Sequence, residues 1–114
     1  MTAVPVRRLE SFLEMLVAER NAARNTIEAY RRDLDDFAGF LARRGESLDE
    51  AGADAIRGYL ARLDQSGMAP RTAARRLSAI RQFYRFLVAE GLRDDDPLAA
   101  IDGPRQGRAL PRLL

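Results

Sequence analysis

The chain has 114 residues, of which 46% are hydrophobic and 32% are charged, a profile typical of one small folded domain rather than a disordered segment. It contains no cysteine and no histidine, which excludes disulfides, thiolate or imidazole metal ligands, cysteine nucleophiles and histidine bases. No apolar run reaches the roughly 18 residues that a membrane span needs, and proline and arginine near the start argue against a secretory signal. We therefore expect a cytoplasmic protein with no cofactor and no bound metal.

Charge is unevenly distributed along the chain, although the formal net charge is only +2. All 19 basic residues are arginine. Residues 20–32 carry four arginines against one acid and residues 67–93 carry six against one, whereas residues 33–66 carry eight acids against four arginines. If the two basic segments share one face of the fold, they form a surface for an anionic ligand. The alternative is scattered, solvated surface charge.

Apolar residues recur every three or four positions in the first half of the chain, the pattern of amphipathic helices. The first helix is predicted over about residues 6–20. Asn25 is the predicted N-cap of the second helix, with Glu28 as its capping-box partner. That helix is predicted to end at residue 43 or 44, before Gly45.

The second half continues the helical pattern. A third helix is predicted over about residues 53–65, closed by Ser66 and Gly67. Pro70 suits the first turn of a fourth helix, which is predicted to run to Glu90 and to stop at Gly91. Because no window alternates as a half-buried strand does, the predicted fold class is all-α, a compact bundle of four main helices.

The C-terminal segment has a different composition. Residues 97–101 are predicted to add one short helical turn, after three adjacent aspartates at 94–96. Side chains of a consecutive run do not converge on one point, so these aspartates are interpreted as a solvated turn rather than a metal site. Residues 102–114 are rich in glycine, proline and arginine and are predicted to be a linker. We therefore expect a helical domain over 1–101 and a linker over 102–114 that leads into a further, C-terminal domain.

A helical wheel of the fourth helix separates an apolar stripe from a basic one. The apolar stripe, with Phe83 and Val88 at its shoulders, comprises Ala73, Leu77, Ile80, Tyr84 and Leu87. The opposite stripe, with Arg81 to one side, comprises Arg71, Arg75, Ser78, Gln82 and Arg85. A face of donors without carboxylates suits phosphate oxygens and the acceptors of guanine in the major groove. The alternative is that these arginines pair with the acidic third helix.

The start of the second helix is a second candidate for anion binding. Free backbone N–H groups at this helix start form a candidate phosphate-binding site. The side chains nearby are Arg24, Thr26, Arg31 and Arg32. Simple helix capping is the alternative for Thr26. Tyr30 is predicted to be a core residue first, with its hydroxyl at the edge of the DNA.

Two segments in these helices carry a family resemblance. Residues 25–34, NTIEAYRRDL, and residues 75–87, RRLSAIRQFYRFL, resemble the second-helix and fourth-helix signatures of Xer-type tyrosine recombinases and related phage integrases. Asp96-Pro97-Leu98, Gly103-Pro104-Arg105 and Leu110-Pro111 resemble the stretch that leads into the catalytic domain of that family. The segments occur in the family's order and spacing, and the resemblance covers essentially the whole chain.

The resemblance implies an N-terminal core-binding domain with a SAM-like fold, which grips one side of double-stranded DNA while the catalytic domain grips the other. It places the following residues at the DNA: Thr26, Tyr30, Arg31, Arg71, Thr72, Arg75, Arg76, Ser78 and Arg81. The wheel independently selects Arg71, Arg75 and Ser78, but it puts Arg76 on the flank of the core, so two positions for Arg76 stay open.

The family's reaction is a transesterification in which a tyrosine attacks a DNA phosphate, with arginine, histidine and lysine in support. Those residues belong to the catalytic domain, and this chain has neither histidine nor lysine. Tyr30, Tyr59 and Tyr84 all sit at positions that fit core packing. We therefore expect no catalytic residue here, a monomeric fragment, and the catalytic domain and other recombinase subunits on DNA as partners.

Three other interpretations compete with this one. One is a helical protein–protein module whose arginines bind an acidic partner, with Phe86 and Val88 in support. A second is a complete small transcription factor, against which the chain shows no tight turn leading into a short recognition helix. A third is a small enzyme, against which the sequence shows no convincing pair of catalytic acid and base.

Overall fold

The computed structural model describes residues 3–101, and the predicted linker over 102–114 lies outside the described residues. The main helices are α1 (Ala3–Arg20), α2 (Arg24–Arg43), α3 (Ala53–Gln65) and α4 (Pro70–Ala89). A short helix follows over residues 97–101. No strand occurs between residues 3 and 101, so the predicted all-α class, with four main helices and a short C-terminal turn, is confirmed.

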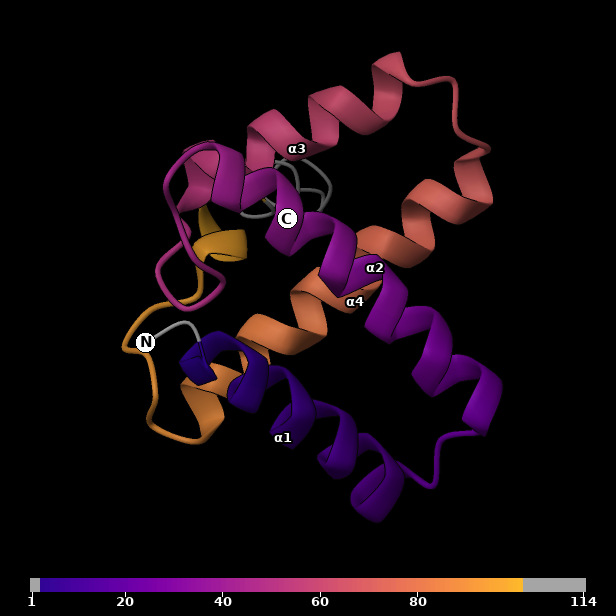
Figure 1. Ribbon diagram of the computed structural model, residues 1–114, viewed down its shortest axis with the longest axis vertical. Helices are drawn as coiled ribbons and strands as arrows, with labels where there is room; N and C mark the ends of the chain where they lie inside the picture. Colours follow the sequence, from indigo (N-terminus) through magenta and orange to yellow (C-terminus); the bar gives the residue numbers. More distant parts are fainter. Residues whose placement is uncertain (1–2, 102–114) are drawn as a thin grey trace, which may run out of the picture.

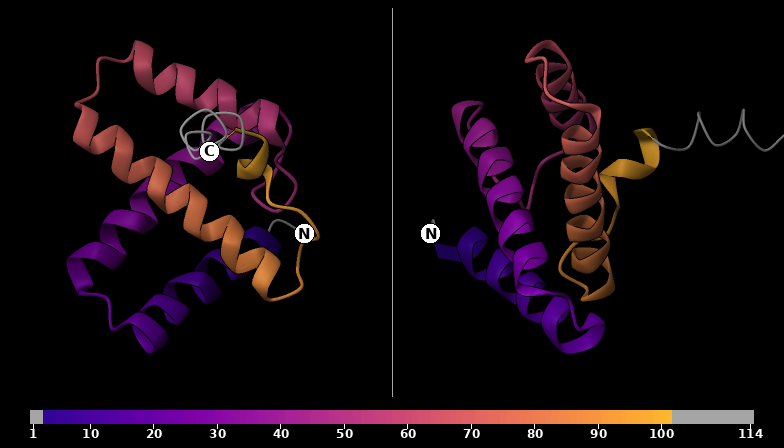
Figure 2. Two further views of the ribbon diagram at one scale, coloured as in Figure 1. Left: turned by 180° about the vertical axis from the view of Figure 1, so that it is seen from behind. Right: turned by 90° about the vertical axis from the view of Figure 1, so that its right-hand side faces the viewer.

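The helices form two hairpins that pack face to face. α1 and α2 make one layer and α3 and α4 make the other, and the short helix lies on the outer side of α4 (Figure 2). α2 and α4 cross at the centre of the molecule, and each of them contacts all the other main helices (Figure 1). The starts of α2 and α4 lie on the same side of this crossing, at the right in Figure 1. α2 and α4 are therefore the two elements that any site at the centre must involve.

The boundary between α1 and α2 differs from the prediction at one residue. Asn21 adopts the left-handed conformation, with φ of 52°, and the turn is closed by backbone hydrogen bonds from Asn21 to Val17 (3.1 Å) and from Ala22 to Leu16 (3.2 Å). The chain is thereby redirected early, and α2 begins at Arg24 with Ala23 as an N-cap that provides no side-chain hydrogen bond. The predicted capping role of Asn25 is wrong, because Asn25 already lies inside the first turn.

Aromatic rings join the two layers into one core. Phe12 of α1 packs edge-on against Phe83 of α4, with ring centroids 5.6 Å apart, and also contacts Phe86 at 5.7 Å. Phe37 of α2 packs against Tyr59 of α3 at 4.9 Å. All these rings except that of Phe86 are fully buried. Each layer therefore contributes aromatic surface to a shared interior, which is the main source of stability in such a small domain.

The core face of α4 is rotated relative to the predicted one. Ala79 and Phe86 are buried, whereas Ala73 and Leu77 are only partly covered and Val88 is 37% exposed. The reason is that α1 packs on the Phe83 and Phe86 side of α4. Ile80, Tyr84 and Leu87 of the predicted stripe are buried as expected. The wheel also included Ala73 and Leu77, because a wheel of one helix does not show where its neighbours lie.

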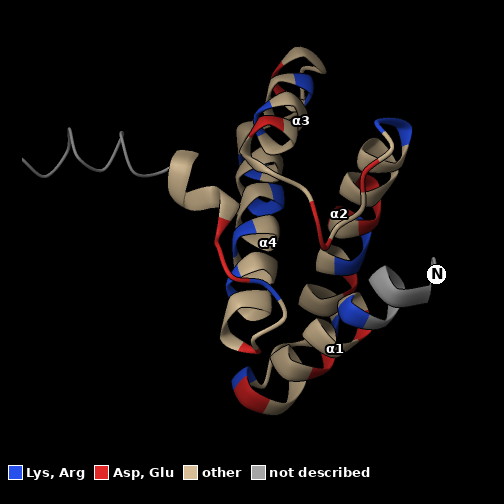
Figure 3. Ribbon diagram, turned by 90° about the vertical axis from the view of Figure 1, so that its left-hand side faces the viewer, with Lys and Arg blue, Asp and Glu red and all other residues tan. Residues whose placement is uncertain are grey.

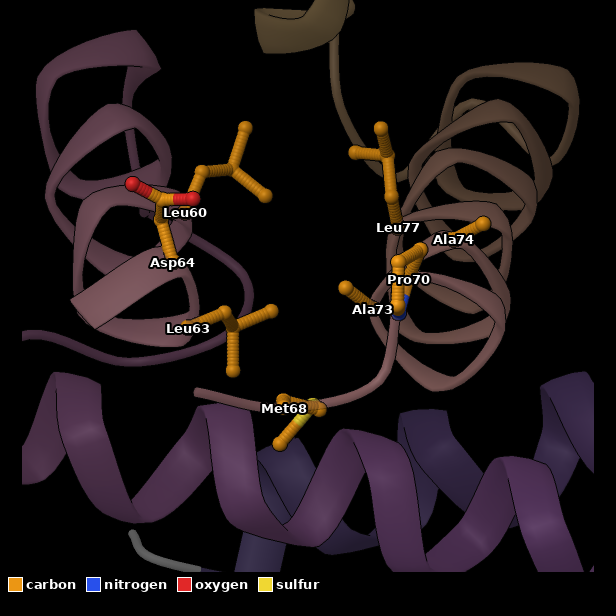
Figure 4. Close-up of a pocket in the computed structure, with 8 residues that line it drawn as sticks. All are labelled: Leu60, Leu63, Asp64, Met68, Pro70, Ala73, Ala74 and Leu77. Atoms are coloured by element: carbon orange, nitrogen blue, oxygen red, sulfur yellow. The ribbon is translucent and has the colours of Figure 1, made fainter. Parts of the chain in front are cut away.

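Ala73 and Leu77 line a groove at the edge of the core. This groove, of about 320 Å³, lies between α3 and α4, and in Figure 4 Leu60 and Leu77 face each other across it. The complete lining comprises Leu60, Leu63, Asp64, Met68, Pro70, Ala73, Ala74 and Leu77.

The short helix at 97–101 is anchored by its own cap. Asp96 accepts a hydrogen bond from the backbone N–H of Leu98 (2.9 Å), and Pro97 occupies the first helical position. Leu98 is buried in the main core. Asp96 thus caps this helix, whereas Asp94 and Asp95 are exposed, as expected of a solvated turn. No acidic, histidine or cysteine cluster suited to a metal ion occurs among the described residues. Within the same part of the chain, no helix is long and apolar enough to cross a membrane.

Candidate nucleic-acid interface

A row of polar contacts, here called the α2–α4 seam, joins the two central helices. It consists of Tyr30, Asp33 and Asp36 of α2 with Arg75, Arg76, Ser78 and Gln82 of α4. Because α2 and α4 cross, residues 40 to 52 positions apart in sequence meet here. The seam contains four of the nine residues that the resemblance placed at the DNA.

The strongest contact of the seam is a side-on ion pair. Arg75 donates from Nε to Asp33 Oδ2 (2.9 Å) and from Nη2 to Asp33 Oδ1 (2.8 Å). The Asp33 side chain is 0% exposed, whereas that of Arg75 is 41% exposed. Two parallel charge-assisted hydrogen bonds fix a guanidinium in one plane. Arg75 is therefore held at the surface by a carboxylate below it.

Arg76 is held deeper. Its Nη1 donates to Asp36 Oδ2 (2.7 Å) and to the Tyr59 hydroxyl (3.1 Å), and its Nε lies 3.5 Å from Asp33 Oδ1. Only 21% of the side chain is exposed. Arg76 thus lies on the flank of the core, where the wheel placed it. The predicted alternative for the basic stripe, pairing with the acidic third helix, is wrong for Arg75, because its carboxylate partner Asp33 comes from α2.

Tyr59 completes this corner, since its hydroxyl donates to Asp36 Oδ2 (2.6 Å). Burial, and then the hydrogen bond to the Asp36 carboxylate, raise the pKa of Tyr59 to about 12. Burial also raises the pKa of Tyr84, whose hydroxyl donates to the Leu48 carbonyl (2.6 Å). Both side chains are fully buried, as predicted, and both phenols are kept in the neutral form.

The raised pKa of Tyr59 predicts a loss of stability in alkali. In the unfolded chain a tyrosine ionises near pH 10, so the contribution of Tyr59 is fully present below pH 10 and is lost as the pH rises toward 12. Urea unfolding between pH 9 and about 11.5 should therefore show stability falling with pH. Tyr59→Phe, which cannot ionise, should show a shallower fall, and equal slopes for the two proteins would contradict this assignment.

The other end of the seam is a chain of neutral hydrogen bonds around Gln82. Its Nε2 donates to the Tyr30 hydroxyl (3.0 Å) and to Ser78 Oγ (3.0 Å), while its Oε1 accepts from Arg20 of α1 (2.8 Å). Tyr30 also packs against the core, as predicted. Gln82 and Arg20 were not among the predicted site residues. The position of Gln82 one turn after Ser78, on the same stripe, was the available signal.

Arg31 forms an ion pair with Glu10 of α1. In this pair Arg31 Nη2 lies 3.1 Å from Glu10 Oε1. The hydrogen bond from Arg31 lowers the pKa of Glu10. Sequence reasoning missed this pair, since the two residues are 21 positions apart on different helices. The guanidinium stays partly exposed, with 42% of the side chain accessible.

Of the remaining predicted residues, Thr26, Arg71 and Thr72 lie in the first turns of α2 and α4, whereas Arg81 lies in the middle of α4. Thr26 and Arg71 are exposed, and Thr72 and Arg81 are partly buried. Arg71 makes no ion pair with any residue between 3 and 101. Neither Ala23, before α2, nor Ala69, before α4, provides a side-chain cap, so the first-turn N–H groups of both helices lack that acceptor.

The arrangement of charge differs between the two central helices. α4 carries five arginines and no acidic residue along its 20 positions, whereas α2 carries both signs (Figure 3). The acids of α2 that face α4 neutralise Arg75 and Arg76. The basic character of the surface therefore depends on the exposed arginines at the two ends of α4, Arg71 and Arg85.

The structure defines an all-helical class of domain, in which an arginine-rich fourth helix crosses the second helix. Residues 9–91 match the phage integrase N-terminal SAM-like domain, and the chain belongs to this family. The family expected from residues 25–34 and 75–87 is thereby confirmed.

The chain is similar to the N-terminal part of several bacterial recombinases. It is 51% identical to the tyrosine recombinase XerD of Rhizobium meliloti (strain 1021) over 114 residues, which are 100% of this chain and 37% of that protein. It is 56% identical to XerD of Agrobacterium fabrum over 107 residues, 94% of this chain and 32% of that protein, and 51% identical to XerD of Caulobacter vibrioides over 105 residues, 92% and 34%. The chain thus spans about a third of the length of these relatives.

Proposed function

We propose that this chain is the DNA-binding part of a XerD-type tyrosine recombinase and holds duplex DNA through α2 and α4. The observation that carries the proposal is the acid-free α4, in which Arg71 is exposed in the uncapped first turn and Arg75 is held at the surface one turn later. Arginine side chains and first-turn N–H groups are the donors that proteins direct at DNA phosphates. We infer that it acts in the cytoplasm, as the composition led us to expect.

The proposed contacts are those that the resemblance implies. They are Thr26, Tyr30, Arg31, Arg71, Thr72, Arg75, Arg76, Ser78 and Arg81. The structure supports a division of labour among them. Thr26 and Arg71 are exposed and suited to phosphates, whereas the ion-paired and half-exposed Arg75 is suited to a fixed base or phosphate contact. Among Arg31, Arg75 and Arg76, Arg76 has the least exposed side chain. We therefore assign Arg76 to stabilising the α2–α4 seam.

We infer that strand cleavage belongs to the remainder of the protein. The chain has no histidine and no lysine, and the hydroxyls of Tyr59 and Tyr84 are bonded inside the fold. A phenol held neutral in the core is a poor nucleophile for a phosphate. The proposed partners are therefore double-stranded DNA, the protein's own catalytic domain and other recombinase subunits assembled on the same DNA.

An NMR titration of the labelled chain with a short random-sequence duplex at two salt concentrations tests the proposal. Shifts are expected to cluster at residues 26–32 and 71–85 and to weaken at higher salt, because binding releases counterions from the DNA and this release is less favourable when the salt concentration is high. An absence of shifts at low salt, or shifts elsewhere, would count against the α2–α4 face. Binding of an acidic peptide but not of duplex would instead favour a protein–protein module.

Arg71→Ala gives the cleanest mutational test, because Arg71 is exposed and makes no ion pair within the described residues. Its loss is expected to weaken binding of random duplex about equally across sequences and to reduce the salt slope by about one unit. Arg43→Ala is the control, since Arg43 is an exposed arginine at the far end of α2. Equal losses for both variants would point to non-specific charge rather than to this face.

A further inference from the structure

We propose that Asp33 is a positioning residue for DNA binding, which holds Arg75 in the orientation that presents its outer edge to the duplex. This inference rests on the proposed function, because it concerns how the same face is organised. It assigns a role to a carboxylate that neither the wheel nor the resemblance placed at the DNA.

The geometry of the pair leaves donors available. A guanidinium has five N–H donors in one plane. Asp33 accepts one from Nε and one from Nη2, which together form one side of that plane. The remaining three, two on Nη1 and one on Nη2, point away from the carboxylate. Because the inner edge faces a fully buried group and 41% of the Arg75 side chain is exposed, the free edge faces outward.

The burial of Asp33 explains why the orientation is firm. A carboxylate with 0% exposure is tolerated in a fold only when it is paired and hydrogen-bonded. Arg75 supplies both hydrogen bonds, and the Arg76 guanidinium adds a second positive charge at 3.5 Å without a hydrogen bond. If Arg75 moved away, the buried Asp33 carboxylate would lose both of these hydrogen bonds. The side chain is therefore ordered before DNA arrives, and binding avoids part of the entropy cost of ordering it.

A purely electrostatic role for Asp33 predicts the opposite effect. If Asp33 only masked positive charge, replacing it by a neutral residue would make the surface more basic and would tighten binding to DNA. If Asp33 positions Arg75, the same replacement weakens binding even though the net positive charge rises. The sign of the change in affinity thus separates the two roles.

The experiment is duplex binding by Asp33→Asn in the 114-residue chain, with a random-sequence duplex as the probe. Its affinity is expected to fall about 3- to 10-fold, the range for the loss of one immobilised side chain. Asp35→Asn is the matched control, because Asp35 is exposed on the same helix and its replacement changes the net charge equally. The control should bind as well as the wild type or more tightly. Unchanged or tighter binding by Asp33→Asn would overturn the proposal.

A spectroscopic readout shows whether Arg75 is released in a variant that stays folded, and the affinity of that folded variant distinguishes positioning from a structural role. The Arg75 Nε–H is expected to give a slowly exchanging NMR signal in the wild type, which is lost in Asp33→Asn while the rest of the spectrum stays folded. If Asp33 had only a structural role, Asp33→Asn would lower the melting temperature but leave the affinity of the folded protein for the duplex unchanged.

Arg75→Lys decides the matter if Asp33→Asn does not fold. Lysine keeps the charge but cannot form the side-on pair, so a similar loss of affinity is expected. Wild-type affinity in Arg75→Lys would overturn the proposal. Failure of the proposed function looks different, because then the wild type and Arg71→Ala would bind the duplex equally well or not at all.

Discussion

Replacing Phe83 by alanine is expected to destabilise the domain by about 3–5 kcal/mol, the cost of removing a large ring from a well-packed core. Phe83 is fully buried and packs edge-on against Phe12 of α1 at 5.6 Å and against Tyr84 at 5.2 Å. Its removal therefore leaves a cavity where the two layers meet. Urea unfolding, with the slope compared between variants, measures the loss.

Val88→Ala is the matched control for this prediction. Val88 lies on the same helix but is 37% exposed, so its replacement should change the stability by no more than about 0.5 kcal/mol. A loss below about 1 kcal/mol for Phe83→Ala would mean that α1 does not depend on this contact for its docking onto α4.

Arg75→Ala is expected to have the largest effect on DNA binding among single arginine replacements. If its outer edge reaches a base, the affinity for duplex should fall by about 1–3 kcal/mol. The same change removes both hydrogen bonds from the buried Asp33 and should cost about 1–3 kcal/mol of stability. Binding must therefore be measured at a temperature where the variant is folded, which circular dichroism establishes.

Arg57→Ala provides the comparison, because Arg57 is also ion-paired but on the exposed surface of α3, with 53% of its side chain accessible. Such a pair contributes little, so both stability and duplex affinity should stay near the wild-type values. A folded Arg75→Ala with unchanged affinity would move the binding face away from the seam.

The local sequence was sufficient to predict most helix boundaries. Gly45, Gly67 and Gly91 all adopt positive φ after α2, α3 and α4, as expected of glycines that end helices. Pro70 occupies the first turn of α4. Such signals depend on the conformational limits of single residues, so they can be read without the fold. Asn25 was misassigned because Asn21 redirected the chain four residues earlier, and either asparagine suits a helix boundary.

The direction of each helix face was harder to predict. Arg71, Arg75 and Ser78 were correctly separated from the apolar side of α4 by periodicity alone. The centre of the core face was not, since it depends on Phe12 of α1, more than 60 positions away from Ala79 and Phe86. A wheel gives relative angles around one axis and contains no information about which neighbour covers which flank.

The sequence by itself determined the fold class, the four helices, the family and the basic character of α4, because these depend on periodicity, residue type and order along the chain. Only the tertiary structure decided which arginines are neutralised. Asp33 and Asp36 meet Arg75 and Arg76 across the α2–α4 crossing, and Glu10 meets Arg31 across α1 and α2. Ion pairing falls off steeply with distance, and distances between helices are set by packing. The number of arginines was therefore readable from the chain, while the charge that each one presents at the surface was not.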